Sequence, residues 1–382
     1  MRWLSALPLL ALLLGCTSPR DRKPQSVEAS LANDLRITHL NVPSADELFL
    51  TGIFPVKRAL WRLLDEDHYG EAMDLSVRRP VVNLAGTVFE AKYGRSGTKL
   101  LANFYHEGAF HIVRLPDQAV GRVLFQLSYF PPLVGGRYIA AHSLLRFELD
   151  QPLEIVAPMP DLAQLAALAA AAPADRLNLL PVEADGVTLR NVAISAEAQW
   201  TQNDTHRAYD LRRGKNGAFI QIVRFMSISE RFKEFYGSGN PVSQIVLETE
   251  HGDAILAEAL RTSQADALNR LYDTFWYNCT TIAFDMVERA SGLRDRRLGF
   301  IRSFMGRRIP VTAPRKLEEY GGLDALPITM DPTLLDESLI GYRSEIQATN
   351  RAECPAGMDA PNCENVRRAI QTLREGGRLS VQ

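Results

Sequence analysis

The stretch LYDTFWYNCTTIAFDMVERASG, from Leu271 to Gly292, predicts an α-helix that begins at an asparagine–cysteine pair. Apolar residues recur at helical spacing after Asn278, and Gly292 supplies a stop. Asn278 is suited to cap the helix, and Thr280 to stand in its first turn. Cys279 is then expected at a helix N-terminus, where unpaired backbone N–H groups and the helix dipole favour a thiolate. The stretch therefore predicts a nucleophilic cysteine, with Asn278 and Thr280 supporting it and the oxyanion that its chemistry forms.

The N-terminus has the pattern of a segment that is removed after export. Arg2 supplies a positive charge, and residues 4–14 form an apolar run that is too short to span a bilayer. The run ends in LLGC at Cys16, which resembles the lipobox of bacterial lipoproteins. The resemblance implies that Cys16 carries a lipid anchor, with acyl chains such as palmitate, and that Thr17 after it directs the protein to the outer membrane. We therefore expect a lipid-anchored protein of the bacterial cell envelope that faces the periplasm; the alternative is an ordinary secretion signal with a chance cysteine.

The composition is that of an ordinary globular protein. The 382 residues are 46% hydrophobic and 23% charged, and the formal net charge is −2. This balance gives no indication of a nucleic-acid surface, so no nucleic-acid partner is expected. The expected organisation is a signal peptide over residues 1–16, a polar tether over 17–30, an N-terminal helical segment over 31–79, a central domain over 80–295 and a helical C-terminal extension over 296–382.

Four cysteines are present, and their expected uses single out one of them. Cys16 is assigned to the lipid. Cys354 and Cys363 lie in a turn-rich loop between expected helices, where an oxidising compartment favours a local disulfide. Cys279 is then the only thiol without a role, which indicates either a reactive thiol or a buried, inert one. The cysteine count alone leaves these two alternatives open.

The central region is expected to be rich in strands. Aromatic and β-branched runs alternate there with turn-like sequences, and the first four runs predict an antiparallel meander. The expected strands cover residues 86–93, 99–105, 109–115, 122–130, 137–149, 187–199, 206–213 and 218–226.

Two helices are expected besides the one that begins at the cysteine. Residues 161–180 are rich in alanine and leucine and predict a packing helix that Pro173 ends. The sequence SQAD over 263–266 has the form of a capping box, and predicts the start of a helix that leads the chain to Cys279. The inward residues of this helix are expected to be Leu268, Leu271, Tyr272 and Phe275.

The strand expected over residues 137–149 provides an imidazole. Its period of two places His142 on the more polar side, while the opposite side is mostly apolar and packs into a core. Tyr138 and Arg146 share the face of His142 but lie four residues away, about 13 Å along a strand. The group that orients the ring is therefore expected from a neighbouring strand. The sequence leaves five candidates: Glu154, Asn191, Ser195, Tyr209 and Gln221.

Acyl transfer by a thiol needs a thiolate, an imidazole within hydrogen-bond reach and N–H donors for the oxyanion. Cys279 at a helix start offers the thiolate and the N–H donors, and His142 offers the imidazole. These two residues are therefore the predicted catalytic pair. His106 and His111 flank a turn but have no third ligand at metal spacing, so no metal is predicted. No cofactor is predicted either.

The order of these features resembles the circularly permuted papain-like enzymes, relatives of the NlpC-type hydrolases and of lecithin:retinol acyltransferase. More closely, AHSLLRF over 141–147 and YNCTT over 277–281 are similar to the two signature segments of the periplasmic domain of Lnb-type lipoprotein N-acyltransferases. The resemblance implies an α+β, permuted papain-like cysteine-hydrolase fold over 80–295, with an antiparallel sheet and helices. It also implies that Cys279 forms a thioester with a fatty acyl group and that His142 assists. That family carries membrane helices after this domain, whereas here a lipid anchor is expected instead.

Three functions follow from these observations. The first is a lipid-anchored envelope enzyme that forms an acyl-thioester and transfers or hydrolyses an acyl group of a lipid or lipoprotein. The second uses the same Cys279–His142 pair on the cell wall, as a peptidoglycan peptidase or amidase of the NlpC type. The third is a non-catalytic envelope lipoprotein in which Cys279 is a buried structural residue.

Overall fold

The computed structural model describes residues 41–49, 74–76, 78–134, 137–184, 186–200, 219–231, 242–247, 249–265, 272–274, 277–291 and 313. Their fold is mixed α+β, which confirms the expected class at that level. The strands are β1 (Val82–Asn83), β2 (Thr98–His106), β3 (Ala109–Pro116), β4 (Val120–Val134), β5 (Arg137–Pro158), β6 (Val187–Gln199), β7 (Ile220–Ser227) and β8 (Val242–Leu247). The helices are α2 (Ala45–Phe49), α3 (Val88–Tyr93), α4 (Leu162–Ala170), α5 (Pro173–Leu179), α8 (Gly252–Ala265) and α9 (Cys279–Ser291).

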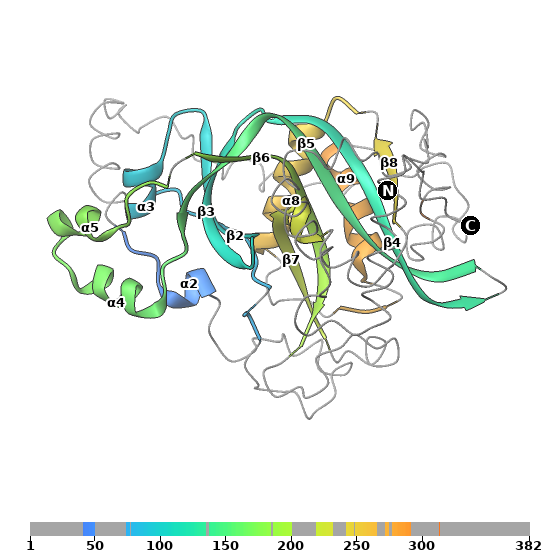
Figure 1. Cartoon of the computed structure of the whole chain (residues 1–382), viewed down its shortest axis with the longest axis horizontal. Helices are drawn as coiled ribbons and strands as arrows, with labels where there is room; N and C mark the ends of the chain where they lie inside the picture. Colours follow the sequence, from blue (N-terminus) through green and yellow to red (C-terminus); the bar gives the residue numbers. More distant parts are fainter. Residues whose placement is uncertain are drawn as a thin grey trace, which may run out of the picture.

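Five of the strands close into a barrel. The sheet runs in the order β1-β2-β7-β6-β5-β4-β8, and β3 closes the ring because it pairs with both β2 and β5. All pairings between these strands are antiparallel except that of β2 with β7, which are parallel at Tyr105 and Met226. β5 is 22 residues long, so it reaches from the barrel into a ribbon with β4 (Figure 1). This one strand therefore connects the barrel to the outer part of the sheet.

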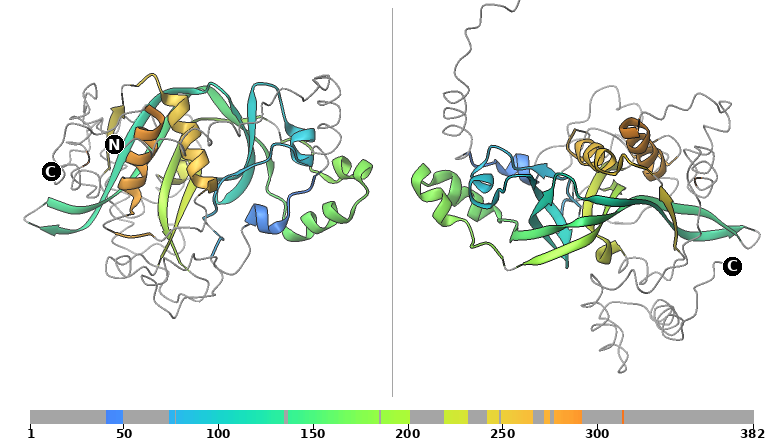
Figure 2. Two further views of the ribbon diagram at one scale, coloured as in Figure 1. Left: turned by 180° about the vertical axis from the view of Figure 1, so that it is seen from behind. Right: turned by 90° about the horizontal axis from the view of Figure 1, so that it is seen from above.

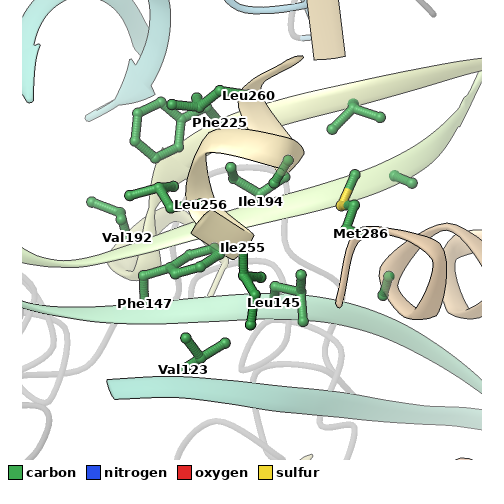
Figure 3. Close-up of a cluster of buried hydrophobic side chains, with 14 of the residues drawn as sticks. Val123, Leu145, Phe147, Val192, Ile194, Phe225, Ile255, Leu256, Leu260 and Met286 are labelled. Atoms are coloured by element: carbon green, nitrogen blue, oxygen red, sulfur yellow. The ribbon is translucent and has the colours of Figure 1, made fainter. Parts of the chain in front are cut away.

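Helices α8 and α9 pack side by side on one face of the sheet (Figure 2). The strand residues that face them are apolar and alternate along the chain, as Leu145 and Phe147 do in β5. Figure 3 shows this cluster, in which Ile255 and Leu256 of α8 and Met286 of α9 pack on β4, β5, β6 and β7. Each such side chain stabilises the fold by about 1.5–3 kcal/mol when it is fully buried. The core thus fixes α9, and with it the helix start at its N-terminal end, against β5.

A second apolar cluster lies at the other end of the molecule. There α2, α3, α4 and α5 pack near β2, β3 and the last part of β5 (Figure 1). Asp161 and Gln164 form a capping box at the start of α4. This cluster contains none of the predicted catalytic residues.

Three expectations about the elements were wrong. Residues 86–93 were expected as a strand, but their buried side chains, Val88, Phe89 and Tyr93, have helical spacing and form α3. The meander does not form, because β3 pairs with β5 instead of β4. The Ala/Leu segment forms the expected packing helix, α4, in which Leu165 and Leu168 are buried and which ends before Pro173. Pro173 also begins a further helix, α5, which was not expected; the fixed φ of proline is favourable at that position.

The third concerns the expected capping box over 263–266. Ser263 lies in the last turn of α8, and its hydroxyl donates to the carbonyl of Val223 and accepts from the N–H of Val81. The motif was misread because the same polar residues also occur where a helix is tied to a neighbouring strand.

Several predicted segments lie outside the described residues. These are the signal peptide, the tether, most of the N-terminal helical segment, the expected strand over 206–213 and, apart from Ala313, the C-terminal extension. Within the described part of the chain, no helix is long and apolar enough to cross a membrane.

Candidate active site

The start of α9 has the local structure that its sequence predicts. The helix begins at Cys279, and the side-chain oxygen of Asn278 accepts a hydrogen bond of 3.0 Å from the N–H of Thr281. The amide nitrogen of Asn278 donates to the carbonyl of Thr274 at 2.8 Å. Asn278 is therefore the N-cap, and its side chain holds the turn that precedes the helix.

The sulfur of Cys279 lies at an edge of β5. In the ladder between β5 and β6, Leu145 is opposite Ile194. Ser143 lies two residues before Leu145 in β5, and its backbone N–H donates to the Cys279 sulfur at 3.4 Å. A backbone N–H of a strand lies in the plane of the sheet, so the sulfur is near that plane, where a strand carbonyl otherwise binds. From there, side chains on both faces of β5 are within its reach.

Thr280 connects the start of α9 to β5 by a hydrogen bond. Its hydroxyl contacts that of Ser143 at 2.9 Å, on the same side of β5 as the helices. Both side chains are fully buried. Thr280 therefore supports the position of Cys279, and its hydroxyl is engaged with β5 rather than turned toward an oxyanion.

His142 approaches the sulfur from the opposite side of β5. Burial raises the pKa of Cys279, but the charge of His142 and hydrogen bonding from His142 and Ser143 lower it more, and together they bring the pKa from 9.0 to about 6. Cys279 is 3% exposed, whereas His142 is only partly buried. The predicted pair is thus brought together, with the thiolate form of Cys279 favoured at neutral pH.

Ser195 of β6 holds the other side of the imidazole. Its hydroxyl lies 2.7 Å from Nε2 of His142, which leaves Nδ1 as the ring nitrogen able to face the sulfur. Of the other candidates, Glu154 pairs with Arg114, and Asn191 accepts from Arg146. Gln221 is opposite Ala198, whose side chain is on the other face of β6 from that of Ser195, and Tyr209 lies outside the described residues. Ser195 was one of the five candidates, and the structure selects it because β6 runs beside β5.

A buried carboxylate, that of Glu197, lies close to His142 and Ser195. Glu197, two residues beyond Ser195 on the same face of β6, makes ion pairs with Arg78 at 2.6 Å, Arg224 at 3.1 Å and Arg231 at 3.3 Å. Burial alone raises the pKa of Glu197, but these arginines, with a smaller effect of His142, lower it well below its usual range. Glu197 therefore stays ionised close to His142.

Sequence reasoning missed the role of Tyr272. It was expected to be an inward residue of a helix, but Asp273 and Tyr277 exchange backbone hydrogen bonds in a tight turn. The turn brings the Tyr272 hydroxyl to the backbone N–H of Cys279, at 3.4 Å. No sequence pattern indicates this contact, since the turn has no glycine or proline, and only the density of aromatic residues before Cys279 points to it.

The remaining predicted site residues are not brought together. Cys16, Cys354 and Cys363 lie outside the described residues, so their lipidation and disulfide stay predictions, while Cys279 is a free thiol. His106 contacts the hydroxyl of Ser227 at 2.9 Å, and His111 contacts the backbone carbonyl of His106 at 3.1 Å. The described part of the chain contains no group of three or more metal-ligating side chains.

No protein-family model, curated protein or solved structure matches this chain. The resemblance to papain-like and Lnb-type enzymes therefore rests on the two short segments around His142 and Cys279.

Proposed function

We propose that the chain is a thiol enzyme that forms an acyl-thioester and then transfers or hydrolyses the acyl group. Cys279 is the nucleophile, His142 moves the proton, and Ser195 orients the imidazole. The observation that supports this best is the environment of the sulfur: a buried thiol at a helix start whose pKa lies near 6 because His142 and Ser143 stabilise the thiolate. An inert structural cysteine has no need of these partners.

The chemistry proceeds in two balanced steps. The thiolate attacks the carbonyl carbon of the substrate, and the protonated His142 gives its proton to the leaving oxygen or nitrogen as that bond breaks. A thioester on Cys279 and a neutral imidazole remain. Water or an amine then loses a proton to His142 and attacks the thioester, and the sulfur leaves as thiolate.

The oxyanion of each step needs donors close to the sulfur. The backbone N–H of Cys279 is in place at the start of α9, and the hydroxyl of Tyr272 lies 3.4 Å from that nitrogen. We propose that these two groups stabilise the oxyanion, the hydroxyl turning its proton toward the substrate. This replaces the expected contribution of the Asn278 and Thr280 side chains, which are used for the cap and for the contact with β5.

We propose an acyl group of a lipid or lipoprotein as the substrate. The lipobox at Cys16 supports this, because a lipid anchor keeps the site beside a membrane. The similarity of residues 141–147 and 277–281 to segments of Lnb-type N-acyltransferases supports it as well. The proposed location is the periplasmic side of the outer membrane.

The thioester is the decisive observation to seek. Purified full-length protein is incubated with a fatty-acyl p-nitrophenyl ester, and intact mass spectrometry records an acyl adduct that hydroxylamine releases. Cys279→Ala is expected to abolish the adduct, and Cys354→Ala with Cys363→Ala, as a matched control for the other thiols, to keep it. Absence of any adduct on the wild type, together with unchanged lipoprotein acylation in Cys279→Ala cells, overturns the proposal. If the wild type releases peptides from purified peptidoglycan and Cys279→Ala does not, the substrate is the cell wall.

The pH dependence of the thiol is a second test. Because the thiolate is the reactive form, alkylation of Cys279 by iodoacetamide should be constant above about pH 7 and fall as the pH drops through about 6. Labelling is read at the peptide that contains Cys279. An inflection at the ordinary value near 8.5 identifies an inert thiol and supports the non-catalytic alternative.

A further inference from the structure

Two buried polar side chains of β4 have no hydrogen-bond partner. They are Gln126, whose amide nitrogen and oxygen are both unpartnered, and Ser128, whose hydroxyl is unpartnered, among all contacts made by the described residues. Gln126 is 0% exposed and Ser128 is 2% exposed. A buried polar group without a partner costs about 1–3 kcal/mol, so each such group in a folded protein calls for a reason.

Their position relates them to the proposed active site. In the antiparallel ladder between β4 and β5, Ser128 is directly opposite His142, and Gln126 is opposite Leu144. Side chains directly opposite each other lie on one face of the sheet with Cβ atoms about 4.5–5.5 Å apart. Ser128 is therefore an immediate neighbour of the imidazole, and Gln126 follows on the same face. Because His142 is partly exposed, this polar row begins where solvent reaches and extends inward.

The absence of partners is not general on this face. Arg146, two residues beyond Leu144, donates to Asn191, to Gln244 at 2.9 Å and to Glu148 at 3.1 Å. Its guanidinium is thus satisfied although it is as deeply buried as Gln126. Gln199 of β6 has an unpartnered side-chain oxygen on the same face, but its amide nitrogen donates to the carbonyls of Asp74 and Trp200. Gln126 and Ser128, by contrast, make no side-chain hydrogen bond to any described residue.

The chemistry of the row selects the ligand. An amide and a hydroxyl each donate and accept, and neither is charged. The charged side chains of this face are paired with one another: Arg146 with Glu148, and Glu197 with Arg78, Arg224 and Arg231. A carboxylate or phosphate therefore finds no free cation in the row, whereas a peptide-like amide matches it, since its carbonyl accepts from the Gln126 nitrogen and its N–H donates to the Gln126 oxygen.

We infer that Gln126 and Ser128 form a subsite that binds an amide group of the substrate next to the carbonyl that Cys279 attacks. The thioester chemistry is the same for both substrates considered above, but the subsite favours an acyl group that carries an amide, as the peptides of the cell-wall alternative do, over the plain fatty acyl group of a lipid. This inference rests on the proposed function, because the subsite is defined by its place beside His142 and Cys279.

Two model esters of equal chain length test the subsite in the full-length protein. N-acetylglycine p-nitrophenyl ester carries an amide at the position in question, and pentanoic acid p-nitrophenyl ester carries methylenes there. The wild type is expected to favour the amide-bearing ester in kcat/KM, and Gln126→Met, nearly equal in shape, is expected to reduce this preference about tenfold by loss of a buried hydrogen bond. Ser128→Ala is expected to reduce it less, since a hydroxyl offers fewer contacts.

Stability provides a readout that separates binding from structure. Because Gln126 has no partner in the free protein, Gln126→Met should raise Tm, by about 2–4 °C, while it lowers the preference. Thr262→Val is the matched control: Thr262 of α8 is also buried with an unpartnered hydroxyl, on the helix side. It should leave the preference unchanged. A lower Tm in Gln126→Met with an unchanged preference assigns Gln126 to structure and overturns the subsite.

The two proposals fail in different ways. If neither ester is turned over in a Cys279-dependent manner, the proposed function fails, and the subsite with it. If turnover depends on Cys279 but the two esters react equally in wild type and Gln126→Met, the subsite alone is wrong.

Discussion

The two faces of the strands β4, β5, β6 and β7 are both buried, but they differ in what they bury. The face toward α8 and α9 is apolar, with Leu145, Phe147 and Ile194 in one cluster. The opposite face of the same strands holds His142 and Ser195, with the charged residues around Glu197. Side chains alternate between the two faces, so each strand contributes to both.

This difference separates the stability of the fold from its chemistry. Apolar packing is non-directional and tolerant, whereas buried polar groups need particular partners at particular distances. Cys279 stands at the boundary, because the start of α9 reaches the edge of β5 and meets side chains from both faces. Substitutions on the two faces should therefore change different observables.

The largest expected effect is on catalysis, from His142→Asn. Loss of the proton carrier should lower kcat for ester turnover by about 10²- to 10⁴-fold, with little change in Tm because the ring is partly exposed. The pKa of Cys279 should rise from about 6 toward its ordinary value, since the charge of His142 is the main effect that lowers it. Turnover and the pH profile of alkylation measure both. Unchanged turnover removes His142 from the mechanism.

Phe147→Ala is the counterpart on the apolar face. Phe147 is fully buried beneath α8, so its truncation should cost about 3–5 kcal/mol of unfolding free energy, measured by urea denaturation. Under folding conditions, the inflection of Cys279 alkylation should stay near pH 6. A shift of that inflection without a loss of stability contradicts the separation of the two faces.

Sequence periodicity predicted the apolar face well. The alternation of Leu145 and Phe147 placed β5, and the helical spacing after Asn278 placed the start of α9. Periodicity failed where a short segment fits two periods, as in α3, and where pairing joins distant strands, as in the contact of β3 with β5. Local patterns contain no information on which strand becomes a neighbour in a closed barrel.

The polar face was only partly predictable. The alternation of residues 137–149 between the two faces of a strand identified His142. The choice of Ser195 among five candidates needed the register of β6 against β5. Glu197 and its arginines were not predicted at all, because charged residues in a sequence are normally taken as exposed. Tyr272 was missed since the turn after it, and not a helical period, sets its direction.

A smaller effect is expected from Ser195→Ala. Its hydroxyl makes one neutral hydrogen bond of 2.7 Å to the imidazole, and such a bond contributes about 0.5–1.5 kcal/mol, or up to about tenfold in rate. The loss should appear in kcat rather than KM, because Ser195 orients His142 and does not touch the substrate. Ser195→Thr keeps the hydroxyl and is expected to recover most of the rate. Equal losses in both variants point to packing at this position instead.

The smallest effect tests the boundary itself, at Asn278. Asn278→Ala removes the cap of α9 and should cost about 1 kcal/mol of unfolding free energy. Asn278→Asp retains the cap, because aspartate accepts from the N–H of Thr281 equally well, but it cannot donate to the carbonyl of Thr274 and it adds a negative charge beside the thiolate. Stability should therefore fall in both variants, while the pKa of Cys279 should rise only in the aspartate variant. Urea denaturation and the pH profile of alkylation measure the two quantities, and an equal rise of the pKa in both variants shows that the helix start cannot be separated into a structural and a chemical part.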